Sequence, residues 1–165
     1  MDFKRIVKHL LMTHWHVNRT FPQDALSTIE QAIKVSEANH TGEIRFAIEG
    51  ALDTKPLLQG QTARERAIEV FSQQRLWDTE NNNGVLIYLL LADRDVEIVA
   101  DRQVHAKVGS REWESICRTM ETAFRQAEFQ RGVMDGIQAV TRHLTQHFPA
   151  SGTNPNELPD RPVMI

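Results

Sequence analysis

The feature that most constrains this chain is the apolar run at residues 85–92, Val-Leu-Ile-Tyr-Leu-Leu-Leu-Ala. It is far shorter than the roughly 20 residues that a helix needs to cross a bilayer. Its length suits a strand, and a strand that is apolar on both sides is typical of a sheet covered on both faces. The chain therefore needs a sheet with helices on each side of it.

Two further segments complete the predicted sheet. Residues 42–50 alternate, with Ile44, Phe46 and Ile48 on one side, which indicates a strand with one well-buried face. Residues 96–101 follow a tight turn at 92–95 and form a hairpin with the apolar run, which would put Asp101 beside Leu86. Because a helix is predicted between the first two strands, those strands are expected to run parallel, with a right-handed crossover.

Helical spacing of apolar residues predicts four main helices. They cover residues 24–39 and 63–78, a segment that Ser110 caps, and a last segment that follows a break at Gly132 and ends near Phe148. The resulting order is helix, strand, helix, strand, strand, helix, helix. This order predicts a three-layer α/β/α sandwich with a small mixed sheet, in which a parallel pair is joined by an antiparallel hairpin.

The 165 residues fit one domain with two flanking segments. Residues 1–20 form a basic amphipathic N-terminal segment, which would either lie on an acidic membrane surface or, as we expect, pack against its own domain. Residues 21–149 form the domain itself. Residues 150–165 are rich in proline, and we expect a disordered tail there.

Composition narrows the functional classes. The formal net charge of -3 argues against a nucleic-acid partner. The nucleotide-binding glycine motifs and the Gly-x-Ser-x-Gly elbow are absent, and the single cysteine, Cys117, cannot form an internal disulfide. The N-terminus lacks a secretory signal pattern and the chain lacks a transmembrane segment, so we expect a cytoplasmic protein, with a location at the periphery of the inner membrane left open.

One edge of the predicted sheet gathers oxygen-bearing side chains. The two parallel strands begin at this edge, and the hairpin returns to it. The residues expected to converge there are Glu43, Asp78, Asn82, Asn83 and Asp101. Oxygen ligands of this kind suit Ca²⁺ or Mg²⁺. The opposite edge also collects acidic residues, namely Glu49, Asp53, Asp93 and Asp95. Acidic residues at turns are usually only solvated, so the choice between the two edges, and whether either is a site, stays open.

Several ordered motifs resemble the TPM-domain family. They are His40-Thr41-Gly42-Glu43-Ile44, then Asn83-Gly84-Val85-Leu86-Ile87-Tyr88, then Asp93-Arg94-Asp95-Val96-Glu97-Ile98 with Ala100-Asp101-Arg102. The helix from Trp113, and the helix from Gly132 to Gly136 that ends in His147-Phe148-Pro149, are also similar. The resemblance covers residues 24–149. The family includes thylakoid-lumen proteins of photosystem II repair and many bacterial proteins, and this chain looks like a short, soluble bacterial member.

The resemblance implies an α/β sandwich, divalent-metal binding (Ca²⁺ or Mg²⁺) and, as an open extension, metal-dependent acid phosphatase activity. The alternative is a non-catalytic interaction module that acts beside a membrane-associated protein. Two departures bear on the site. Asn82-Asn83-Gly84 stands where the family commonly has Asp-Asn-Gly, and Ala100-Asp101-Arg102-Gln103-Val104 replaces a glycine-rich segment. An asparagine can ligate Ca²⁺ through its carbonyl but adds no charge.

Overall fold

The computed structural model describes residues 2–152 and 155–165. Within these residues the elements follow one another as α1 (Phe3–Leu11), α2 (His14–Thr20), α3 (Gln23–Glu37), β1 (Glu43–Glu49), α4 (Thr54–Leu58), α5 (Ala63–Gln73), the 3-10 helix η1 (Leu76–Asp78), β2 (Gly84–Leu90), β3 (Asp95–Ala100), α6 (Arg102–Val108), α7 (Ser110–Arg125), α8 (Phe129–His147) and β4 (Val163–Met164). No helix in this described part is both long enough and apolar enough to span a bilayer.

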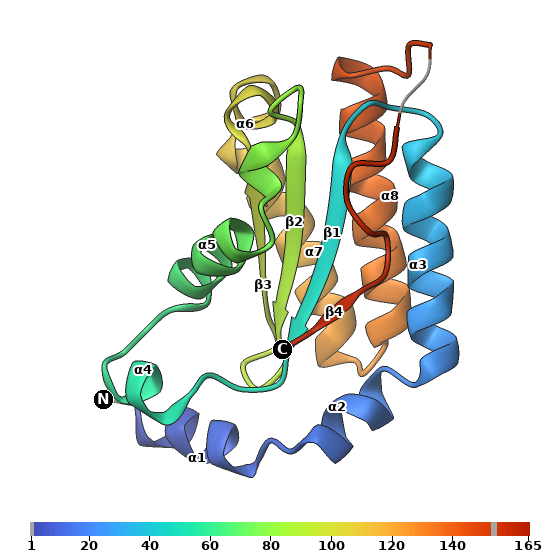
Figure 1. Ribbon diagram of the computed structural model, residues 1–165. Coiled ribbons are helices and arrows are strands. Elements are labelled where there is room, and N and C mark those ends of the chain that lie inside the picture. Colours follow the sequence, from blue (N-terminus) through green and yellow to red (C-terminus); the bar gives the residue numbers. More distant parts are fainter. Residues whose placement is uncertain (1, 153–154) are drawn as a thin grey trace.

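The sheet is mixed and has the strand order β3-β2-β1-β4. β1 runs parallel to β2 and to β4, while β2 and β3 form an antiparallel hairpin. α3, α7 and α8 cover one face and α5 covers the other, as Figure 1 shows. The predicted three-layer α/β/α fold with a small mixed sheet is therefore confirmed.

Two apolar cores lie on the two faces of the sheet. Ile44, Phe46 and Ile48 of β1 pack into the larger core with the helices of the α3, α7 and α8 layer. Leu86, Tyr88 and Leu90 of β2 point the other way, toward the α5 side. Every residue of β2 is buried, as its continuous apolar run predicts for a strand with cover on both faces.

The hairpin register differs from the predicted one by two residues. Leu90 pairs with Asp95 and Val99 pairs with Leu86, so the Asp101 N–H lies opposite Gly84 and donates to its carbonyl at 2.8 Å. β2 ends two residues earlier than the apolar run, because the turn takes in Leu91 and Ala92 and closes with Arg94 at a positive φ of 53°. Asp101 therefore sits at the very end of the sheet.

The helices also depart from the prediction in places. Residues 63–78 are split into α5 and the short η1, and the segment after Asp101 forms α6, which the apolar pattern had not indicated. Gly132 lies inside α8, and the break comes earlier, at Ala127 with a φ of 61°. A Cβ at Gly132 would lie 2.6 Å from the Phe124 ring, so the glycine is explained by the close approach of α7 and α8.

The C-terminal segment differs from the disordered tail predicted for residues 150–165. Residues 153–154 lie outside the described residues, but beyond them β4 pairs with β1 at Ala47 and Ile48. The reason is that the second face of β1 carries Arg45, which is buried and needs partners. Its guanidinium donates to the carbonyls of Pro159 and Arg161, both in this segment. The segment thus helps to cover the second face of β1, for which the alternating pattern had predicted no burial.

Candidate functional site

The predicted site lies at the edge where β1 and β2 begin and β3 ends. Asn83, directly before β2, is fully buried. Its backbone N–H donates to Thr79 Oγ1 at 3.1 Å, and its Nδ2 donates to the Thr41 carbonyl at 2.7 Å. The first bond fixes the backbone and the second orients the side-chain amide, whose Oδ1 has no hydrogen-bond partner among the described residues. Asn83 therefore holds a buried carbonyl oxygen without a protein donor.

Asp101 is in a similar position on the neighbouring strand. It is the N-cap of α6, where its Oδ1 accepts the Arg102 N–H at 2.6 Å. The other carboxylate oxygen, Oδ2, is buried and has no hydrogen-bond partner within residues 2–152 and 155–165. Because Asp101 bonds to the backbone of Gly84, the residue after Asn83, the two unpartnered oxygens come from adjacent strands at one edge.

Gly84 follows Asn83 and bonds to the Asp101 N–H, and its position has no room for a side chain. A Cβ at Gly84 would lie 2.4 Å from the Leu76 carbonyl oxygen, which is backbone and cannot move aside easily. Gly84 is not at a positive φ, so the Asn83-Gly84 pair is not explained by a left-handed turn. The residue that takes that conformation is Asn82, at a φ of 49°. The glycine lets η1 pack against the start of β2.

The Glu43 carboxylate binds the C-terminal segment of the chain. Its carboxylate accepts the backbone N–H of Glu157 and of Leu158, each at 3.2 Å. Burial raises the pKa of Glu43 above its ordinary value, although these N–H groups favour the charged form. Nearby, Glu37 accepts the Ile44 N–H at 3.0 Å. Glu43 thus anchors the C-terminal segment, and its oxygens have protein donors already.

The two remaining predicted residues lie at the surface. Asp78 ends η1 with its side chain exposed, and Asn82 is partly exposed. Across the part of the chain that the structure describes, no three or more His, Cys, Asp or Glu side chains are grouped so as to hold a metal ion. Of the five predicted ligands, Asn83 and Asp101 are therefore the pair whose oxygens are buried and available.

Sequence reasoning missed the residues that orient Asn83. Thr41 supplies the acceptor for the side-chain amide, and Thr79 accepts its backbone N–H. The neighbouring His40 is fully buried, and burial lowers its pKa to about 4, so its imidazole is neutral at neutral pH. Thr41 lies in the motif His40-Thr41-Gly42-Glu43, which is the one sequence feature that could have pointed to it. The motif does not reveal that Thr41 positions the side-chain amide of Asn83, which lies just before β2.

Two of the four acidic residues at the opposite edge, Glu49 and Asp93, are paired with cations. Glu49 accepts Arg66 Nε at 2.8 Å and the Tyr88 hydroxyl at 2.8 Å. Asp93 accepts Arg5 Nε at 2.8 Å, and its Oδ2 lies 3.1 Å from His9 Nε2. Carboxylates bound in this way are satisfied by the protein, so Glu49 and Asp93 are structural residues. Asp53 is exposed, and burial together with neighbouring carboxylates raises the pKa of Asp95 to about 6.

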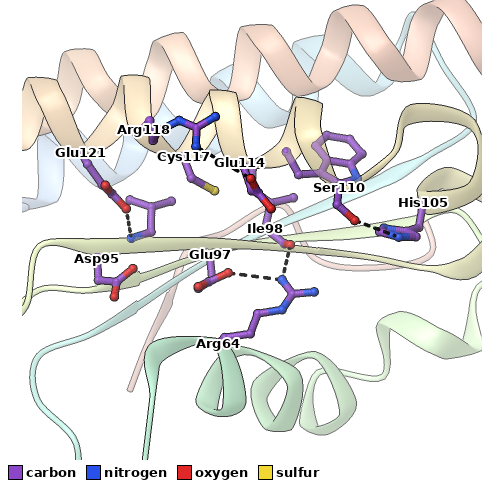
Figure 2. A pocket seen from close by; sticks show the side chains of 12 residues that line it. Arg64, Asp95, Glu97, Ile98, His105, Ser110, Glu114, Cys117, Arg118 and Glu121 are labelled. Atoms are coloured by element: carbon purple, nitrogen blue, oxygen red, sulfur yellow. Dashed lines mark hydrogen bonds and ion pairs between the residues drawn. The ribbon is translucent and has the colours of Figure 1, made fainter.

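A pocket of about 480 Å³ lies beside β3, between α7 and the Arg64 side chain of α5 (Figure 2). Arg64 donates to the Ile98 carbonyl at 2.7 Å, and Glu121 accepts the Val96 N–H at 3.3 Å. These backbone groups belong to the free edge of the sheet, so the side chains block further strand pairing. Burial raises the pKa of Cys117 to about 12, which keeps the thiol protonated and a poor nucleophile.

The comparisons with known proteins agree with this architecture. A family model described as the TPM domain matches residues 18–143. The NMR structure of the BA42 protein from the psychrophilic bacterium Bizionia argentinensis has 28% sequence identity and a TM-score of 0.75, covering 86% of this chain and 92% of that one. A comparison with curated proteins found no match.

Two more distant structures share the fold. The N-terminal domain of a protein from P. gingivalis has 16% identity and a TM-score of 0.62, covering 79% of this chain and 82% of that one. The N-terminal domain of the cg2496 protein from Corynebacterium glutamicum has 13% identity and a TM-score of 0.55, with 79% and 76% covered. Because the family model spans well over half of the chain and the motifs lie in the expected order on the sheet, the chain belongs to the TPM-domain family.

Proposed function

We propose that this TPM domain binds a divalent cation, Ca²⁺ or Mg²⁺, through Asn83 and Asp101. The observation that carries the proposal is the pair of buried oxygens, Asn83 Oδ1 and Asp101 Oδ2, without hydrogen-bond partners among the described residues. A buried acceptor without a donor costs about 1–3 kcal/mol. A cation that both oxygens ligate would remove that cost.

The chemistry of the two groups suits a hard cation. Ca²⁺ takes carboxylate and amide carbonyl oxygens and completes its shell with backbone carbonyls and water. One negative charge and one neutral amide make a weakly charged site, so we expect dissociation constants of roughly 10⁻⁴ to 10⁻³ M. This proposal narrows the predicted ligand set, since Glu43 would have to give up its bonds to Glu157 and Leu158 before it could contribute.

Phosphatase activity is an extension of the same proposal. A bound cation would polarise a phosphate ester. Arg102, exposed at the start of α6 beside Asp101, is the residue of this chain that would bind a phosphoryl oxygen. Hydrolysis of p-nitrophenyl phosphate, measured with and without each cation and in Arg102→Gln, tests the extension separately from binding. Absence of cation-dependent hydrolysis would remove the extension and leave the binding proposal in place.

The decisive experiment is thermal unfolding in EDTA and then in millimolar Ca²⁺ or Mg²⁺. A ligand that binds only the folded state raises stability by RT ln(1 + [L]/Kd), about 1.4 kcal/mol at a tenfold excess over Kd. We expect a saturable gain in the wild type. Asp101→Asn should lose the gain but remain as stable in EDTA, because asparagine also caps helices well and carries no buried charge.

Asp78→Asn is the matched control, since it removes a carboxylate from the same predicted set at an exposed position. This variant should keep the full cation-dependent gain. A flat response of the wild type to both ions would contradict the proposal and favour the alternative of a non-catalytic interaction module. Equal loss in Asp78→Asn and Asp101→Asn would show that the ligand set is wrong.

A further inference from the structure

Helix α1 is attached to the domain through the polar side chains of Arg5 and His9 and through Ile6. The His9 ring is buried; its Nδ1 accepts the Leu52 N–H at 3.0 Å, so the ring proton is on Nε2, 3.1 Å from Asp93. Arg5 donates to the same Asp93 carboxylate at 2.8 Å. A surface helix of a globular protein usually turns its apolar side inward. Here the inner side of the helix combines these polar contacts with Ile6, which packs against the core on the α5 side.

The outer side of α1 carries large apolar side chains in solvent. Phe3 is 76% exposed, Leu10 63% and Leu11 67%, and Val7 is also exposed. Their spacing of i, i+4, i+7 and i+8 puts them on one face of the helix. Trp15, at the start of α2, is 61% exposed. Single exposed apolar residues are common, but an apolar stripe along one helix is a mark of an interaction surface.

Basic residues accompany the stripe. Lys4 and Lys8 are exposed and follow Phe3 and Val7 directly in the sequence, which places them along one border of the apolar face. The Arg19 guanidinium lies over the Trp15 ring, 5.2 Å from its centroid. The nearby Asp2 is engaged as the N-cap of α1, where its side chain accepts the Lys4 and Arg5 N–H groups.

We propose that α1 and the Trp15 turn of α2 form a binding surface for an anionic lipid bilayer. An apolar helix face bordered by lysines, followed by an exposed tryptophan in the next helix, fits a segment that lies in the plane of a membrane interface. The apolar residues enter the acyl boundary while Lys4 and Lys8 meet anionic headgroups. Charge complementarity is the reason to choose this occupant over a second copy of the chain, which would bring the same lysines against each other.

The position of this surface separates it from the proposed cation site. In Figure 1, α1 and α2 lie along the end of the molecule where β1 finishes, whereas β1 and β2 begin at the far end. Asn83 and Asp101 belong to the far end. The lipid surface therefore does not depend on the proposed cation site, and each can be tested alone.

The test is co-sedimentation of the full chain with phosphatidylcholine vesicles, with and without phosphatidylglycerol. A parallel readout is tryptophan fluorescence of the Trp77→Phe variant. This variant keeps two tryptophans, of which Trp15 is exposed and Trp113 is buried. We expect binding to the anionic vesicles, weakened by salt, together with a blue shift of the Trp15 emission. The double variant Leu10→Ser, Leu11→Ser should lower partitioning by roughly tenfold or more.

Two further variants make the result specific. Lys4→Glu with Lys8→Glu should abolish the preference for anionic vesicles. Val35→Ser is the matched control, because Val35 is an apolar residue of α3 that is 57% exposed, and this change should leave binding unaltered. Failure to bind either kind of vesicle would overturn the proposal. Equal binding to both kinds of vesicle would also overturn it, as would binding that the leucine variant retains.

Discussion

The two ends of the sheet carry similar numbers of polar side chains but treat them differently. Where β1 and β2 finish, Glu49 is bound by Arg66 and Tyr88, and Asp93 is bound by Arg5 and His9. Where the same strands begin, Asn83 and Asp101 each keep one buried oxygen without a hydrogen-bond partner in the described part of the chain. The carboxylates of Glu49 and Asp93 are thus satisfied within the protein, while one oxygen each of Asn83 and Asp101 remains available as a ligand.

This difference separates structural acids from candidate ligands. Both ends look alike in the sequence, because each is a group of Asp, Glu or Asn residues beside strands. A paired carboxylate contributes to stability and has few free lone pairs for a cation. Removing residues from the two ends should therefore produce different effects, and the experiments below test that expectation.

The largest effect is expected from Glu49→Ala. The change leaves the Arg66 charge and the Tyr88 hydroxyl, which burial holds in its protonated form, without their shared acceptor. Loss of one partner from a buried ion pair costs about 3–5 kcal/mol. Urea denaturation of the variant measures this loss.

Glu69→Ala is the control for Glu49→Ala, because Glu69 also bonds to Arg66, at 3.0 Å, but is half exposed. An exposed pair contributes about 0–1 kcal/mol. If the two alanine variants lost equal stability, the distinction between the buried pair and the surface pair would fail.

The pH dependence of stability tests the opposite end. Burial raises the pKa of Glu37 from 4.5 to about 9, although the Ile44 N–H favours its charged form. The folded state then binds this proton more tightly than the unfolded state, so stability is highest below about pH 4.5 and falls as the pH rises toward 9. The limiting slope is about 1.4 kcal/mol per pH unit, and we expect a loss of about 2.5 kcal/mol between pH 5 and 7.

Glu37→Gln mimics the protonated side chain and should flatten this part of the pH profile. Denaturation midpoints measured from pH 5 to 8 would report the change, with the exposed Glu80→Gln as the control. A Glu37→Gln profile that still follows the wild type would show that Glu37 is ionised in the folded protein.

The smallest effect is expected from Asp93→Asn, at about 1–2 kcal/mol. The amide can accept from Arg5 or His9 but lacks the charge that both now meet. Because these contacts hold α1, hydrogen exchange of the amides in residues 3–11 should become faster while the sheet is unchanged. The exposed Asp53→Asn serves as the control, and unchanged exchange in α1 would mean that other contacts hold the helix.

The structure brings some of the predicted residues together and not others, for reasons that lie in particular residues. Strand order and the parallel crossover were enough to bring Asp101 to the same edge as Asn83, even with the hairpin register wrong by two residues. Glu43 was included because it begins β1, but the direction of its carboxylate depends on a segment more than a hundred residues away. Thr41 could not be identified as the partner of Asn83, because neither motif contains a signal for the other.

The sequence by itself determined the layers of this protein. The apolar run of β2 requires cover on both faces, and the helical spacing on either side of it supplies that cover, since burial of apolar area is the dominant driving force of folding. The tertiary structure alone decided which polar groups are satisfied. It paired Glu49 with Arg66 and packed the C-terminal segment against Arg45. It also left one oxygen each of Asn83 and Asp101 without a hydrogen-bond partner among residues 2–152 and 155–165. Hydrogen bonds depend on distance and direction over a few ångströms, and residue order does not specify these until the chain has packed.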